Sequence, residues 1–232
     1  MEKLSFSNLH DIFYKKCVVV VGSAPSGLDN IGSFIDSFDL VVRVNNYKVK
    51  GRDKRGLSYD YTDRLGTRTD YHYSFYGGSI RKQPNELLQD GIKGHLCKCP
   101  DDVCHVTQWH IDNKQIFGGD FRGIYRRREG FWVKPVYIPP KDHYLKLFRI
   151  LDEHVPSTGF ACIWEMMNCE PKQLHITGFD FMTSRLHNVN EKWLAGDPND
   201  PIGHDFDKEK LYVKKWIKRH DWITCDKRLE EI

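Results

Sequence analysis

Small residues follow a β-branched run near the start of the chain, and this combination is suited to binding an anion. The valines at 18–21 lead directly into the turn Gly22-Ser23-Ala24-Pro25-Ser26-Gly27. Backbone N–H groups in such a turn, and those that begin a following helix, attract phosphates. A second apolar run at 40–42 ends in Arg43-Val44-Asn45-Asn46, where the Asn45 amide can supply neutral hydrogen bonds. Strand, turn, helix and strand in this order are typical of a nucleotide or phosphate site in an open α/β sheet.

A second segment of the same kind begins at Pro156-Ser157-Thr158-Gly159. Proline disfavours helix before it and Ser or Thr caps the helix after it, so the small residues expose helix N-terminal amides that favour an anion. The apolar stretch that follows ends at Gly178-Phe179.

Two histidines are candidates for proton transfer. His204 stands at the entrance of the last long helix, with four residues between it and Glu209. His187 lies earlier, in a polar segment. A histidine with its ordinary pKa of about 6.5 can accept a proton at physiological pH.

The elements that must position these residues alternate between strand and helix. Hydrophobic patterning predicts strands at 18–21, 40–44, 69–76, 96–99, 133–138 and 173–177. It predicts helices at about 7–15 with Ser7 as cap, 31–38, 79–92, 142–154 with Asp142 as cap, 158–169 and 207–220. Residues 48–63 are predicted to form a loop, and residues 182–203 are predicted to form a loop or lid. This alternation implies a mostly parallel sheet.

Composition narrows the class of protein. A chain of 232 residues with 40% hydrophobic residues is expected to form one domain, or one domain with a lid. The 35 basic and 32 acidic residues nearly balance, which argues against a dedicated nucleic-acid binder. No apolar run is long enough to cross a bilayer, and the first residues lack the apolar region of a signal peptide. Seven cysteines, an odd number, favour a reducing cytoplasm. The oligomeric state stays open.

Taken in order, these segments resemble the motifs of the sialyltransferase family. Residues 17–76 resemble the large motif, with Arg43-Val44-Asn45 and the later segment that holds Arg68. Residues 155–179 resemble the small motif, and His204 with Glu209 resembles the very small motif, H-x4-E. His187 corresponds to the histidine of the third motif. The chain departs from the family at Ser23, where an Asn is usual, and after His187, where aromatic and acidic residues are usual.

The resemblance implies a fold and a reaction. The fold is a single Rossmann-like, doubly wound, mostly parallel α/β sheet over residues 1–232, the metal-independent variant of the GT-A glycosyltransferase fold, with a lid at about 182–203. The reaction is the inverting transfer of an acidic keto-sugar, sialic acid or Kdo, from a CMP donor to a hydroxyl of a glycan acceptor. No cofactor is implied beyond the CMP-sugar itself.

The resemblance also implies roles for particular residues. His204 would be the base, and His187 would assist the departing phosphate. Arg43, Arg68 and Glu209 would support the site. Cys17 and Cys169 correspond to the family's disulfide, but in a reducing cytoplasm buried free thiols are expected instead. Donor binding would fall to Gly22, Ser23, Ala24, Asn45, Ser157, Thr158, Gly159, Gly178 and Phe179.

Other interpretations remain open at this point. A pterin pyrophosphokinase-like enzyme would use a related turn with ATP and Mg²⁺, a non-catalytic domain would bind a nucleotide or glycan, and a glycosyltransferase could act on modified DNA bases. Asp205 and Asp207 resemble a D-x-D metal motif but are expected to cap the last long helix. The cysteines and histidine between Cys97 and His105 do not have the spacing of a usual zinc site.

Overall fold

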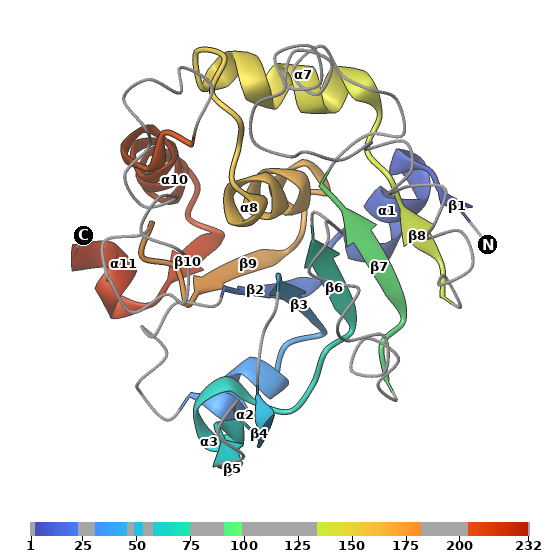
Figure 1. Cartoon of the computed structure of the whole chain (residues 1–232), viewed down its shortest axis with the longest axis vertical. Helices are drawn as coiled ribbons and strands as arrows, with labels where there is room; N and C mark the ends of the chain where they lie inside the picture. The colour runs from blue at the N-terminus through green and yellow to red at the C-terminus, as the bar shows by residue number, and fades with distance from the viewer. Residues whose placement is uncertain are drawn as a thin grey trace.

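One sheet organises the chain. The computed structural model describes residues 3–22, 31–45, 49–52, 58–74, 91–98, 134–181 and 204–231. Within these ranges eight strands form a sheet in the order β1-β8-β7-β6-β3-β2-β9-β10 (Figure 1), and every pairing in it is parallel. The strands are β1 (Lys3–Leu4), β2 (Cys17–Val21), β3 (Leu40–Val44), β6 (Tyr71–Ser74), β7 (Gly94–Cys97), β8 (Val136–Tyr137), β9 (Gln173–Thr177) and β10 (Ile223–Cys225).

Helices cover both faces of this sheet. Figure 1 shows α7 and α8 on one side of the central strands and α2 and α3 on the other. The fold is therefore doubly wound, as the sequence predicts. The helices are α1 (Phe6–Phe13), α2 (Gly32–Asp36), α3 (Thr62–Leu65), α7 (Lys141–Ile150), α8 (Thr158–Asn168), α10 (Phe206–Arg219) and α11 (Lys227–Glu231).

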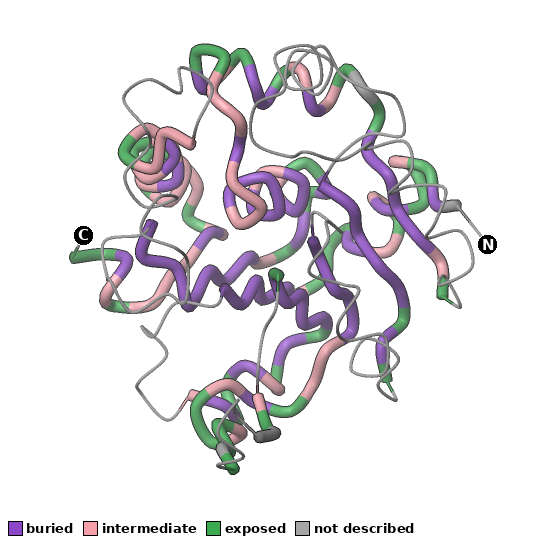
Figure 2. The backbone as a smooth tube through the Cα atoms, in the orientation of Figure 1, coloured by how far each residue is buried: buried purple, intermediate pink, exposed green. Residues whose placement is uncertain are grey.

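The valine run of β2 is buried because its side chains pack into apolar clusters on both faces of the sheet. Val18 and Val20 point into the larger apolar cluster, and Val19 and Val21 point into a smaller one on the opposite face. Side chains alternate between the faces of a strand, so a strand covered on both sides must be apolar throughout. Figure 2 shows the central strands as a continuous buried band.

The strand order reverses at β2, and this reversal marks where a ligand is expected. β2 pairs with β3 on one side and with β9 on the other. Open α/β sheets bind ligands outside the carboxyl ends of their strands at such a switch point. The residues that leave β2 and β9 at this edge are Gly22 and Gly178.

Several predicted elements are confirmed, with shifted ends. Strands at β2, β3 and β9 match closely, and those at β6, β7 and β8 are shorter or displaced by up to three residues at their starts. Helices α2, α8 and α10 lie where periodicity places them. Most of the predicted helix at 79–92 lies outside the described residues, as does the predicted lid at 182–203.

Two predicted caps are wrong. Ser5, not Ser7, caps α1, because the Ser5 side chain accepts from the Asn8 amide while the Asn8 side chain accepts from the Ser5 amide. This reciprocal pair starts the helix earlier than the apolar pattern suggests. Asp142 lies inside the first turn of α7, whose N-cap is Pro140. The negative carboxylate at this position interacts favourably with the positive end of the helix dipole.

The predicted loop at 48–63 is also wrong. It contains an antiparallel hairpin, β4 (Lys50–Arg52) and β5 (Ser58–Asp60), followed by α3. The Asp60 carboxylate accepts from the Thr62 amide at 3.0 Å and from its hydroxyl at 2.7 Å, which starts the helix. Strands of three residues are too short to show an alternating pattern.

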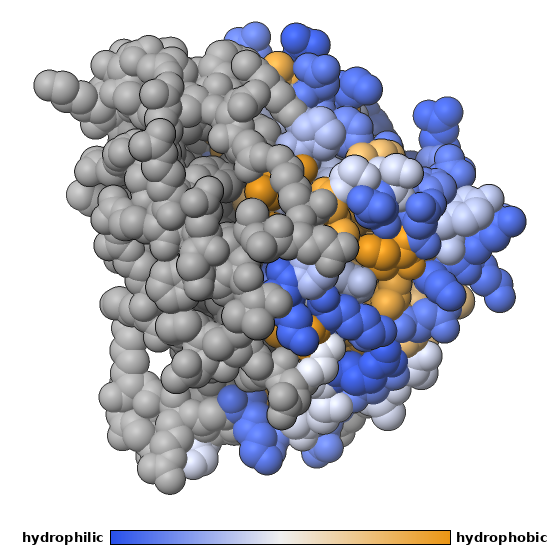
Figure 3. All heavy atoms as spheres, turned by 90° about the vertical axis from the view of Figure 1, so that its right-hand side faces the viewer, coloured by the Kyte–Doolittle hydropathy of each residue, from blue (hydrophilic) through white to orange (hydrophobic). Residues whose placement is uncertain are grey.

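The polar and apolar residues on the surface are distributed as expected for a protein with its apolar core inside. The described part of the face in Figure 3 is mainly hydrophilic, with small apolar areas between charged side chains. Among the described helices, none has both the length and the apolar character that a membrane span requires.

Candidate active site

Two glycines meet where β2 and β9 end. The Gly22 amide donates to the Thr177 carbonyl oxygen at 2.8 Å. A Cβ on Gly22 would lie 2.2 Å from the Gly178 carbonyl oxygen, so the two backbones leave no room for a side chain. Gly178 also has a φ of +74°, a conformation that glycine adopts without strain. The two turns that the sequence analysis selected separately are therefore in contact.

The ring of Phe179 joins this contact to the start of α8. A Cβ on Gly159 would lie 2.5 Å from a Phe179 ring carbon, which explains why α8 begins with glycine in its first turn. The exits of β2 and β9 and the N-terminus of α8 thus form one packed corner at the carboxyl edge of the sheet. Ser23 and Ala24, which continue the first turn, lie outside the described residues.

Asp226, which sequence reasoning did not select, holds this corner from the C-terminal side. Its Oδ2 accepts from the Gly178 amide at 2.9 Å and from the Thr177 hydroxyl at 3.0 Å, and its Oδ1 accepts from the Leu229 amide at 2.9 Å. A lone Asp between a short strand and a short helix carries no signal in the sequence beyond helix capping.

Removing this carboxylate should loosen the corner. Asp226→Ala leaves the Gly178 amide and the Thr177 hydroxyl without their acceptor and removes the cap of α11. Hydrogen bonds to a charged group contribute about 1.5–3 kcal/mol each, so we expect the free energy of unfolding to fall by about 3 kcal/mol. Urea denaturation measures this change.

Asp221→Ala is the matched control, because Asp221 is exposed just before β10. We expect its effect to stay within about 0.5 kcal/mol. Equal losses in the two variants would show that Asp226 does not hold the corner.

Glu209 binds the residue that caps α8. The Ser157 amide donates to Glu209 Oε1 at 2.5 Å, and the Ser157 hydroxyl donates to Oε2 at 2.6 Å. The same hydroxyl oxygen accepts from the Phe160 amide at 3.2 Å, as an N-cap should. The Ser157 amide is consequently occupied, which corrects the expectation that it contacts the donor. Thr158 and Gly159 begin the helix, so their amides belong to the N-terminal set that lacks intrahelical partners.

Glu209 is fully buried in α10. Burial raises the pKa of its carboxyl group to about 7, although the two Ser157 contacts and the charge of Lys98 act in the opposite direction. A carboxyl group with this pKa changes its charge near neutral pH. Its contact with Ser157 is what brings the start of α10 against the start of α8.

His204 lies beside the same turn. Its Nδ1 is 2.6 Å from the Val155 carbonyl oxygen. A carbonyl can only accept, so we assign the proton to Nδ1, which leaves Nε2 as the basic nitrogen of the neutral ring. The ring keeps part of its surface exposed, yet desolvation by the protein around it, helped by the charge of Lys98, lowers its pKa to about 4. This corrects the ordinary pKa that the sequence analysis assumed, and the ring is neutral at pH 7.

Asn45 stands at the same edge, directly after β3. Its φ of +58° turns the chain out of the sheet, and its amide donates to the Tyr73 carbonyl oxygen at 2.9 Å. Its carbonyl oxygen lies 2.7 Å from Nε2 of the buried His72, which donates to it. Burial lowers the pKa of His72 to about 4, so this donor is a neutral imidazole. The exposed Asn45 side chain remains placed to meet a ligand.

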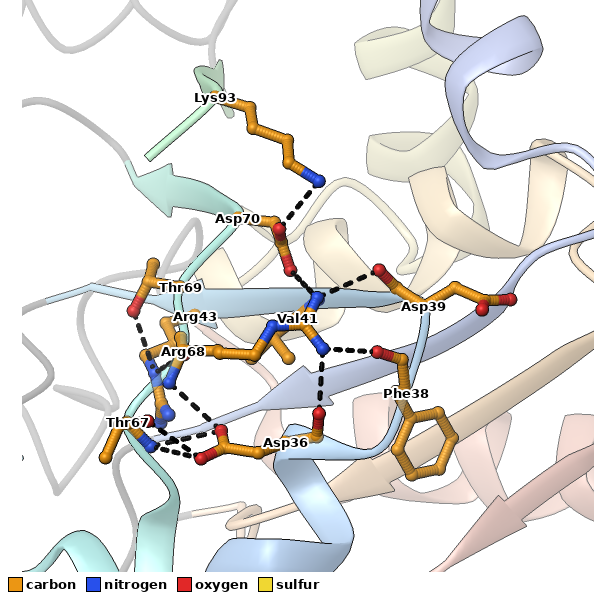
Figure 4. A network of polar contacts seen from close by, with 10 residues as sticks. All are labelled: Asp36, Phe38, Asp39, Val41, Arg43, Thr67, Arg68, Thr69, Asp70 and Lys93. Atoms are coloured by element: carbon orange, nitrogen blue, oxygen red, sulfur yellow. Dashed lines mark hydrogen bonds and ion pairs between the residues drawn. The ribbon is translucent and has the colours of Figure 1, made fainter. Parts of the chain in front are cut away.

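The two arginines of the large motif are held in a different place (Figure 4). Arg68 donates to the carbonyl oxygens of Asp36, Phe38 and Asp39 and pairs with Asp70 at 2.9 Å. Asp70 in turn accepts from the Val41 amide near the start of β3, so this network lies toward the amino edge of the sheet.

Arg43 is fully buried and belongs to the same network. Its guanidinium donates to the carbonyl oxygens of Arg68 and Leu65, at 2.9 and 2.6 Å. These contacts tie the segment that holds Arg68 to β3. These contacts of the two arginines are with the scaffold around the β3–β6 connection.

Lys98 is a further residue that sequence reasoning missed. It follows β7 at the carboxyl edge, only 6% of its surface is exposed, and its Nζ donates to the Pro156 carbonyl oxygen at 2.8 Å. A polar residue directly after an apolar strand is the same signal that identified Asn45. In Lys98 it was obscured by the neighbouring cysteines.

Some predicted site features are absent or lie outside the described residues. His187 and most of the Cys97–His105 cluster fall outside them. Cys17 and Cys169 are both free thiols, so the disulfide that the resemblance implies is not formed. Across the described ranges, no three His, Cys, Asp or Glu side chains are grouped to hold a metal.

The chain is similar to known proteins, although no family model matches the sequence. The chain is 24% identical over 251 residues to type 2 lactosamine alpha-2,3-sialyltransferase of Mus musculus, covering 94% of this chain and 68% of that protein. It is 22% identical over 229 residues to a human CMP-N-acetylneuraminate-beta-1,4-galactoside alpha-2,3-sialyltransferase, covering 88% of this chain and 55% of that one.

Solved structures share the fold. A mammalian sialyltransferase in complex with Gal-beta-1-3GalNAc-ortho-nitrophenol aligns with a TM-score of 0.54 at 18% identity, covering 95% of this chain and 72% of that chain. The chain is similar to sialyltransferases in both sequence and fold. A variant of the sialyltransferase CST-II in complex with CMP aligns with a TM-score of 0.50 at 14% identity, covering 90% of this chain and 80% of that chain. The predicted resemblance to sialyltransferases, the α/β fold and the glycosyltransferase class are thereby confirmed.

Proposed function

We propose that this protein transfers sialic acid from CMP-sialic acid to a hydroxyl group of a glycan, with inversion and without a metal ion. The observation that carries the proposal is the shared position of two motifs. The His204 ring is bonded to Val155, and Ser157, two residues later, caps the helix whose first turn packs on Phe179 and so on the Gly22–Gly178 corner. Relatives of the chain carry CMP-N-acetylneuraminate in their names or CMP in their structures.

The donor phosphate is proposed to lie at the N-terminus of α8. The amides of Thr158 and Gly159 lie at the N-terminus of an 11-residue helix. This end of the helix dipole is positive and stabilises an anion. The Asn45 side chain, on the neighbouring strand end, adds neutral hydrogen bonds to the nucleotide. This arrangement favours a departing CMP, whose phosphate carries the charge that develops as the bond to the sugar breaks.

His204 is proposed as the general base. Its Nε2 takes the proton of the acceptor hydroxyl while that oxygen forms a bond to the anomeric carbon and the bond to the CMP oxygen breaks. A single displacement of this kind inverts the configuration. An anionic donor nearby raises the pKa of a histidine, so donor binding strengthens this base relative to the free enzyme.

A transfer assay with EDTA tests the proposal directly. The chain is incubated with CMP-sialic acid and an array of galactose-terminated acceptors, and CMP release and product mass are measured. We expect turnover that EDTA leaves unchanged, because helix amides and neutral side chains replace a metal at the phosphate.

Parallel reactions with CMP-Kdo and with ATP and Mg²⁺ separate the alternatives. If the protein turns over CMP-Kdo and not CMP-sialic acid, the transferred sugar is Kdo. The rest of the proposal, a metal-independent transfer from a CMP donor, would still hold. Transfer that stops with EDTA would refute metal independence, and ATP-dependent pyrophosphoryl transfer would refute the proposal as a whole. Saturable CMP binding without turnover on any acceptor would indicate a binding domain.

A further inference from the structure

Lys98 is a buried cation beside the turn that leads into α8. Removing an ammonium group from water is unfavourable unless polar contacts compensate for it. The Pro156 carbonyl oxygen supplies one such contact at 2.8 Å. Pro156 directly precedes Ser157, the cap of α8, so the lysine acts on the backbone of the turn that leads into this helix.

Three side chains hold three consecutive residues of this turn. Nδ1 of His204 donates to the Val155 carbonyl, Lys98 donates to the Pro156 carbonyl, and Glu209 accepts from both the amide and the hydroxyl of Ser157. The lysine comes from the end of β7, whereas the other two come from the start of α10. The turn is thus fixed from two sides by elements far away in the sequence.

We propose that Lys98 is a positioning residue for the transfer reaction, which holds the turn at 155–157 in register with the base and places a positive charge beside the His204–Glu209 pair. This inference rests on the function proposed above. It assigns to Lys98 no contact with the substrate, and it makes the charge as well as the hydrogen bond part of its role.

The charges around the pair support this inference. Desolvation is the main cause of the low pKa of His204, and the charge of Lys98 lowers it further. Desolvation raises the pKa of Glu209, and the nearby charge of Asp205 raises it further. The charge of Lys98 lowers the pKa of Glu209 and so opposes both effects. Loss of the lysine charge should therefore move both pKa values upward, so that more Glu209 is protonated at neutral pH and fewer lone pairs are available to Ser157.

Three substitutions separate the charge from the hydrogen bond. Lys98→Met removes both, Lys98→Gln keeps an uncharged donor, and Lys98→Arg keeps the charge. Lys172→Met is the matched control, because Lys172 is exposed just before β9, at the opposite edge of the sheet. The pKa of the His204 imidazole is measured in the resting protein by NMR, with its signal assigned from a His204→Asn variant, and kcat/KM for transfer is measured against pH.

We expect Lys98→Met and Lys98→Gln to raise the pKa of His204 and to lower kcat/KM by about 10- to 100-fold, the scale of a small misplacement of reacting groups. Lys98→Arg should keep the low pKa and recover most of the activity, and Lys172→Met should match the parent in both. An unchanged His204 titration in folded Lys98→Met protein would overturn the inference. Loss of folding in all three variants would overturn it too, because a purely structural role then suffices.

The titration uses no substrate, so the two proposals can fail separately. A chain that transfers no sialic acid but shows the upward shift refutes the proposed function and leaves the electrostatic role of Lys98 standing. A chain that transfers sialic acid equally well with Lys98→Met refutes only the role of Lys98.

Discussion

His204→Asn is expected to lose most sialic acid transfer while retaining CMP binding. Asparagine can place its Nδ2 near the position of the histidine Nδ1, so the hydrogen bond to the Val155 carbonyl can be kept. It has no basic nitrogen at the position of Nε2. A general base contributes about 10²- to 10⁴-fold to a rate, and we expect kcat to fall by a factor in this range.

Two measurements check this expectation. Initial rates of transfer give kcat, and calorimetric titration with CMP gives the dissociation constant, which should stay within about threefold because the base does not bind the nucleotide. His220→Asn is the matched control, since His220 follows the same helix at its other end. If His204→Asn turns over at the rate of the parent, another group must be the base.

Gly22→Ala is expected to damage stability and CMP binding together. The new Cβ would lie 2.2 Å from the Gly178 carbonyl oxygen and 3.1 Å from the Phe179 ring. The oxygen belongs to backbone and cannot rotate away, so β2 and β9 must separate where their ends meet. Overpacking of this kind costs about 3 kcal/mol, and the displaced corner no longer presents the start of α8 correctly.

Gly91→Ala separates this overlap from a general intolerance of side chains at glycine. Gly91 has a φ of +107°, and a Cβ there would meet nothing within 4 Å. Its substitution should cost about 1–2 kcal/mol from backbone strain alone and leave CMP binding unchanged. Urea denaturation compares the two variants, and a smaller loss for Gly22→Ala than for Gly91→Ala would contradict the close contact.

The central sheet and the order of the site segments could be predicted from local sequence patterns. The valines of β2 and β3 are buried on both faces, and such strands leave a continuous apolar run that needs no tertiary information to be found. Glycine after β2, the Ser157 cap of α8 and glycine after β9 are local requirements of backbone and helix ends, so they are visible in the sequence too.

Short elements were not predicted, because they lack the long apolar runs that identify the central strands. The strands of the hairpin and of β10 have three residues each. Three residues are too few to show a periodic pattern, so strand pairing and not propensity decides where these strands form. The cap at Ser5 likewise depends on a reciprocal contact with Asn8 that composition does not reveal.

Which side chains act together depends on the three-dimensional fold. Asp226, Lys98 and Glu209 reach the corner from β10, β7 and α10, and each contacts a residue about 50 positions away. Such contacts depend on the order in which strands pair, which local patterns do not encode. Burial, another property of the whole fold, lowers the pKa of His204 and raises that of Glu209. The residue types were therefore readable from the sequence, whereas their partners and their charges were set by the fold.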